Sequence, residues 1–144
     1  MNQVDLAKDY LNQSKIRLRT ARNVINDQAY AYCVRQCQEA VELSLKAALR
    51  IVGKDFPKWH DIGVVLIKEK ESYPNFFSSE IDKLALISEF LASKRELAMY
   101  GDDDSKKSPS MLFNKEVAES ALKDTEFCLK AVEKLFEAFL KEQE

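Results

Sequence analysis

The chain has 144 residues, of which 46% are apolar and 32% are charged, and its formal net charge is −2. This length suits one domain, and the apolar share is high enough to fill a core, so a mainly disordered chain is excluded. The small net charge gives no basic field over the whole chain. Any contact with nucleic acid therefore has to come from a local patch.

The first fifteen residues, MNQVDLAKDYLNQSK, contain polar and acidic side chains and no unbroken apolar run. We therefore expect neither a signal peptide nor a membrane span, and a cytoplasmic location follows by default. Three cysteines in such a chain favour free thiols over a disulfide framework. Cys33 and Cys37 are four residues apart and suit a buried helix face better than a metal site, for which they would supply only two ligands. No metal and no cofactor are expected.

Apolar residues that recur every three or four positions predict helices along most of the chain. The first is expected over about Asp5–Ile25 and the second over about Tyr30–Val52, where Gly53 and then Pro57 end it. A third begins near Asp61, whose carboxylate can cap it, and stops before the segment SYPN.

Two further helices are expected in the second half of the chain. One starts after Ser78 or Ser79 and runs to Tyr100, and the other covers about Asn114–Lys141. The segment GDDDSKKSPS between them has the composition of a loop. The sequence therefore predicts an all-α fold, a five-helix up-and-down bundle in which residues 1–144 form a single domain.

The usual signatures of catalysis are missing from the sequence. It has no glycine-rich phosphate loop, no Ser/His/Asp set and no two-histidine metal motif. The run Asp102, Asp103 and Asp104 fits a solvated loop better than a cation site, and we expect a structural role for His60. We interpret one set of polar residues as the solvated or partner-facing side of the second helix: Arg35, Gln36, Gln38, Glu39, Glu42 and Lys46.

Residues 29–66, AYAYCVRQCQEAVELSLKAALRIVGKDFPKWHDIGVVL, carry an alanine and aromatic start, the pattern QxxEAVELxLKAxL, a glycine turn and an HD pair. With RELAMYGDDDSKKSPSMLFNKEVAESAL further on, this segment resembles the HEPN family. The resemblance implies a small helical bundle from bacteria or archaea, commonly a homodimer. Many HEPN proteins are paired with a minimal nucleotidyltransferase as toxin and antitoxin, and many are metal-independent ribonucleases.

The resemblance also points to a site at the end of the fourth predicted helix. Ribonucleases of the family have an arginine there and a histidine four to six residues later; here Arg95 matches the arginine, Tyr100 stands five residues on, and no histidine follows. A base for cleavage at a 2′-hydroxyl needs a pKa near the working pH, which imidazole has, whereas a tyrosine hydroxyl ionises only near pH ~10. Arg95 and Tyr100 are the only catalytic candidates, and whether the protein is an enzyme stays open.

Three functions are consistent with this helix end. Arg95 can clamp the phosphate of a nucleotide or RNA, with Tyr100 stacking on a base or donating its hydroxyl and with Lys106 and Lys107 swinging toward the phosphate. A ribonuclease with an atypical site is the first alternative. The second is a structural or protein-interaction module, in which Arg95 is a cation favoured by the helix dipole.

Helix geometry limits how Arg95 and Tyr100 act together. Five residues correspond to a rotation of about 500°, so the two side chains point about 140° apart on a regular helix. They converge only if the helix loosens near Met99, which Gly101 favours, or if each reaches a second subunit.

Overall fold

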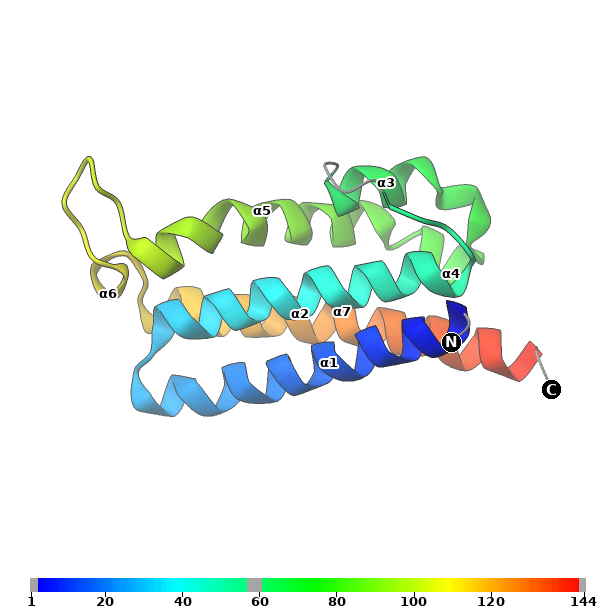
Figure 1. Ribbon diagram of the computed structural model, residues 1–144, viewed down its shortest axis with the longest axis horizontal. Coiled ribbons are helices and arrows are strands. Elements are labelled where there is room, and N and C mark those ends of the chain that lie inside the picture. Colours follow the sequence, from blue (N-terminus) through cyan, green and yellow to red (C-terminus); the bar gives the residue numbers. More distant parts are fainter. Residues whose placement is uncertain (1–2, 57–60, 143–144) are drawn as a thin grey trace.

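The computed structural model describes residues 3–56 and 61–142. Four long helices run lengthwise and alternate in direction: α1 (Gln3–Val24), α2 (Tyr30–Ile51), α5 (Ile81–Tyr100) and α7 (Lys115–Glu142) (Figure 1). The shorter α3 (Ile62–Lys68) packs on α5 (Figure 1). The predicted all-α, five-helix up-and-down bundle is confirmed.

Short helical segments fill the connections between the five main helices. These are the 3₁₀ turns Ile25–Asp27 and Lys70–Ser72, and the four-residue helices α4 (Asn75–Ser78) and α6 (Pro109–Leu112). None of them was predicted, because four residues span about one turn and cannot show an apolar period.

Helix ends follow the predicted chemistry. The Asp61 carboxylate accepts a hydrogen bond from the backbone N–H of Gly63 at 2.8 Å and caps α3, as expected. α2 ends at Ile51, and Gly53 has a φ of +76°, a left-handed conformation that glycine adopts without steric cost. Pro57 and His60 lie outside the described residues, so the predictions for them stay untested.

The core is one cluster of apolar side chains to which all five main helices contribute, and α2 is its centre. α2 contacts α1, α3, α5 and α7, and its buried residues include Leu45 and Leu49, both fully enclosed. The long buried stripe predicted for this helix is thereby confirmed. Among the described residues, no helix is both long and apolar enough to cross a membrane.

Candidate functional site

The end of α5 is regular up to its last residue. The backbone N–H of Gly101 donates to the carbonyl of Leu97 at 2.9 Å, and Gly101 then leaves the helix with a φ of +76°. The expected loosening near Met99 is wrong: the chain stays helical through Tyr100. Arg95 and Tyr100 therefore point about 140° apart and do not converge within one chain.

Arg95 occupies an inward position of α5. Leu84, Ser88, Leu91 and Ala98 precede and follow it at steps of four and three, and all four are buried. Arg95 itself is exposed, and it has no hydrogen bond or ion pair with the described residues. At Arg95, therefore, the inward face of α5 is exposed to solvent. The guanidinium there has no partner among the described residues.

The structural alternative for Arg95 does not fit this position. The last turn of α5 holds no basic residue, and Arg95 lies more than one turn before Tyr100. The attraction between a cation and the helix dipole falls off within the last turn. Stabilisation of the helix end therefore does not account for Arg95.

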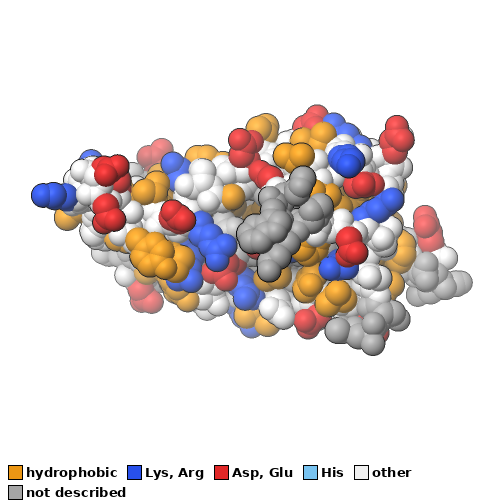
Figure 2. Space-filling model, turned by 45° about the horizontal axis from the view of Figure 1, so that its top comes forward, with side chains coloured by type: hydrophobic (Ala, Val, Ile, Leu, Met, Phe, Trp, Pro, Cys, Tyr) orange, Lys and Arg blue, Asp and Glu red, His pale blue; other side chains and the backbone are white. Residues whose placement is uncertain are grey.

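A second cation lies on α2. The Nε of Arg35 is 3.5 Å from a carboxylate oxygen of Glu39, and the other Glu39 oxygen accepts a hydrogen bond from Arg17 at 3.2 Å. Figure 2 shows Lys and Arg side chains interspersed with Asp and Glu side chains over this face of the molecule. This surface therefore carries charges of both signs, and Arg35 is paired with Glu39.

The interpretation of Gln38 as a solvated residue is wrong. Its side chain is only 4% exposed, and its Oε1 has no hydrogen-bond donor among the described residues. It stands on α2 in a stripe with Val34, Val41 and Leu45, all buried. The sequence signal was available, because Gln38 continues the apolar period at steps of four and three, but its polarity suggested the surface.

A cavity of about 310 Å³ lies beside this part of α5. Ala98, three residues after Arg95, lines it together with the first turn of α2, including Tyr30 and Ala31, and Pro109 of α6. Ala29 precedes α2 without a side-chain cap, so the first N–H groups of α2 have no side-chain acceptor from it. Sequence analysis missed this cavity, since its walls come from segments far apart in the chain.

Tyr100 and the two loop lysines lie outward. Tyr100 is 73% exposed, and the loop after it projects beyond the bundle (Figure 1). Asp102 and Lys107 exchange two backbone hydrogen bonds of 2.8 and 3.1 Å, which close the loop. Lys106 and Lys107 are exposed in this closed turn, so a movement toward Arg95 would have to open it.

The acidic run is also occupied by local bonds. The Asp102 carboxylate accepts from the backbone N–H of Asp104 at 3.2 Å and from the hydroxyl of Ser105 at 2.9 Å. Within residues 3–56 and 61–142, no three His, Cys, Asp or Glu side chains are grouped to hold a metal ion. These contacts fit the predicted solvated loop.

Cys33, Cys37 and Cys128 are free thiols and all three are buried, as expected for core positions. A hydrogen bond between the first two lowers the pKa of Cys33 and, together with burial, raises that of Cys37. Burial raises the pKa of Cys128 to about 12. Their full burial makes all three thiols core residues.

Comparison with known proteins decides the family. The HEPN domain family matches residues 7–135, nearly the whole chain. The chain belongs to the HEPN family. This HEPN protein is similar to TT1696 from Thermus thermophilus, whose crystal structure superposes with a TM-score of 0.69 at 23% identity, covering 93% of this chain and 98% of that one. At that identity the likeness concerns the fold. A search of curated proteins finds no match.

Proposed function

We propose that this HEPN protein binds the phosphate of a nucleotide or an RNA through Arg95, in the cytoplasm. The observation that carries the proposal is an exposed guanidinium, unpaired among the described residues, on an otherwise buried stripe of α5 next to a cavity of about 310 Å³. Guanidinium groups bind phosphate with two parallel charge-assisted hydrogen bonds. Tyr100 adds an exposed ring and hydroxyl, and Lys106 and Lys107 add charge at the same end of the molecule.

The test is a titration with a short fluorescent RNA and with ATP, at low and high salt. Arg95→Ala is expected to weaken binding about tenfold or more, since a charge-assisted pair contributes ~1.5–3 kcal/mol. Tyr100→Phe separates hydroxyl from stacking, because only the hydroxyl is lost. Arg19→Ala is the matched control: Arg19 is exposed on α1, away from α5. Equal affinity in the parent and in Arg95→Ala would contradict the proposal.

Cleavage of RNA is expected to be weak or absent, because Arg95 has no histidine after it in the chain. A ribonuclease with an atypical site remains the alternative. It predicts product formation in EDTA that is lost in both Arg95→Ala and Tyr100→Phe.

We also propose that the protein forms a homodimer and is the HEPN component of a toxin–antitoxin pair with a minimal nucleotidyltransferase. Membership of the HEPN family supports both parts. Purification from the native host followed by mass spectrometry tests the pair, and would also reveal a bound nucleotide or a modified Tyr100.

A further inference from the structure

The cavity beside α5 is lined by aromatic residues. It measures about 310 Å³ and lies where the start of α2 meets the end of α5 and α6. Its aromatic lining residues are Tyr30 and Tyr32 of α2 and Phe113, which follows α6. Ala98 of α5 contributes only a methyl group, which leaves the space open. Because this volume is at the lower end of the range for ligand pockets, and aromatic side chains pack well on flat rings, the cavity suits one planar ring system.

The hydroxyl groups of the two tyrosines are available to a ligand. Tyr73, by contrast, is buried, and its hydroxyl donates a hydrogen bond to the carbonyl of Ala48 at 2.8 Å. The side chains of Tyr30, which is half-buried, and Tyr32, which is 43% exposed, make no hydrogen bond with a described residue. Each of these two hydroxyls can therefore both donate a hydrogen bond to a ligand and accept one from it.

Arg95 is a close neighbour of the cavity wall. It precedes Ala98 by three residues on α5, and side chains three apart on a helix have their Cβ atoms ~5–6 Å from each other. In a nucleotide, only the sugar separates the phosphate from the base. A phosphate held by the Arg95 guanidinium therefore leaves its attached base within reach of the cavity.

We infer that the cavity is a nucleobase subsite: when Arg95 holds the phosphate of a nucleotide, the base enters the cavity and contacts Tyr30 and Tyr32. Proteins bind unstacked bases by stacking aromatic side chains on them and by hydrogen bonds to their edges. A base that is paired within a duplex is not free to enter, so the ligand is a free nucleotide or an unpaired residue of an RNA strand. This inference rests on the proposed phosphate binding by Arg95 and adds the part of the ligand that is recognised.

Isothermal titration calorimetry with AMP and with ribose 5-phosphate tests the subsite, because the two ligands share the sugar and the phosphate and differ in the base. AMP is expected to bind about tenfold more tightly, since stacking on an aromatic side chain adds affinity for each base. Arg95→Ala is expected to weaken the binding of both ligands. Equal affinities of the parent for the two ligands would overturn the subsite and leave the proposed phosphate binding intact. Binding of neither ligand would overturn both.

Variants of the lining residues test where the base binds. Ala98→Leu places a larger side chain in the cavity and is expected to remove most of the preference for AMP, with the affinity for ribose 5-phosphate unchanged. Ala131→Leu is the matched control, because Ala131 is a partly buried alanine of α7 that is not among the residues lining the cavity. Tyr32→Ala, at an exposed position, is expected to weaken the binding of AMP alone, and Tyr32→Phe to retain most of it. Circular dichroism confirms that each variant is folded.

Stacking on Tyr100 is the competing explanation for a preference for AMP. Tyr100 is exposed and is not among the residues that line the cavity, so Tyr100→Ala is expected to keep the preference. A short single-stranded RNA, titrated in the same series, distinguishes the two sources of the base: tighter binding than AMP indicates a strand, and equal binding a free nucleotide. A preference for AMP that persists in both Ala98→Leu and Tyr32→Ala, or that is lost in Tyr100→Ala, would overturn the inference.

Discussion

Arg95 shares one face of α5 with Leu91, one turn before it, and with Ala98, three residues after it. Leu91 and Ala98 are both buried, whereas position 95 carries a guanidinium. A polar side chain at an inward position stabilises a fold only when it has a partner, and Arg95 has none among the described residues. The Arg95 guanidinium therefore makes no partnered contact with the described residues that would stabilise the fold. Such conflicts between local pattern and side-chain type occur at functional sites.

Replacing Arg95 with leucine separates binding from stability. Arg95→Leu is expected to leave the free energy of unfolding unchanged or to raise it by up to about 1 kcal/mol, because leucine adds apolar contact and no bond is lost. Urea denaturation measures this. Arg17→Leu is the control, since it removes the 3.2 Å hydrogen bond to Glu39 and should be less stable. If the free energy of unfolding of Arg95→Leu were lower than that of Arg17→Leu, Arg95 would have a structural role.

At the scale of elements, the α3–α5 contact depends on one missing methyl group. Gly63→Ala should gain ~1 kcal/mol in helix propensity, yet it is expected to destabilise the protein because its Cβ would lie 3.0 Å from both Cα and Cβ of Ala85. Ala85→Gly removes the opposing Cβ. Thermal unfolding of the two single variants and the double variant measures the coupling between the two positions. The double variant is expected to lose less stability than the two single variants lose in total. Strict additivity would contradict the close contact.

Sequence alone predicted the long helices within a few residues, because apolar spacing, the Asp61 cap and Gly53 are local signals. It misplaced Gln38, which continues the buried stripe of α2 but was assigned to the surface because its side chain is polar. It identified Arg95 by resemblance and its angle to Tyr100 by helix geometry, but it overestimated the effect of Gly101. A glycine after a helix permits a left-handed residue there without loosening the preceding turn.

At the scale of the whole molecule, the alkylation rates of the buried thiols measure how readily the bundle opens. Cys37 on α2 and Cys128 on α7 are both fully buried, and each has a raised pKa. At pH 8.5 their alkylation by iodoacetamide is expected to be slow in the native protein and fast in urea, followed by mass spectrometry. Equal rates would mean that the core opens locally.

The raised pKa values of these thiols also determine whether the stability of the protein rises or falls with pH. A thiol in the unfolded chain ionises near pH ~8.5, and a thiol with a raised native pKa keeps its proton longer, so the native state binds more protons above that pH. The stability contributed by Cys128 is therefore present below this pH and is lost as the pH rises toward about 12.

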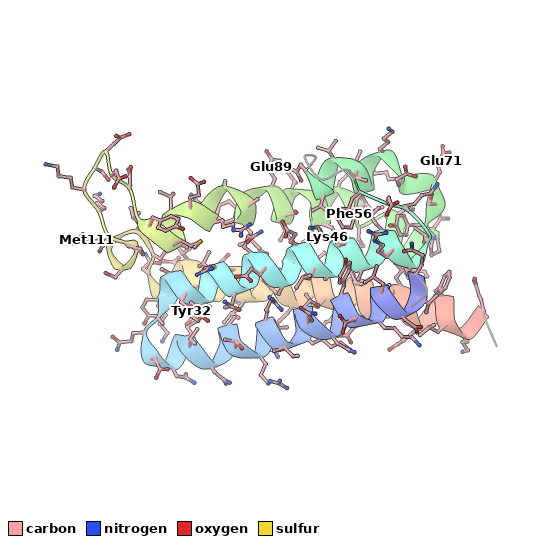
Figure 3. The ribbon with its side chains drawn as sticks, in the orientation of Figure 1. Tyr32, Lys46, Phe56, Glu71, Glu89 and Met111 are labelled. Carbon is pink, nitrogen blue, oxygen red and sulfur yellow. The ribbon has the colours of Figure 1, made fainter. Side chains whose placement is uncertain are left out.

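The closed loop between Asp102 and Lys107 bears on how the chain could be divided. It projects from the bundle, and its exposed Lys106–Lys107 peptide bond is a natural target for a trypsin-like protease once the two backbone hydrogen bonds open (Figure 1). Beyond it, α7 packs along α2 through fully buried side chains such as Ala118 and Val132. In Figure 3, α2 carries the labelled Tyr32 and Lys46 and runs alongside α7, on which it packs. After cleavage the two fragments would stay associated through this packing. The same two fragments, expressed separately, are expected to reassemble, as the halves of a split reporter do.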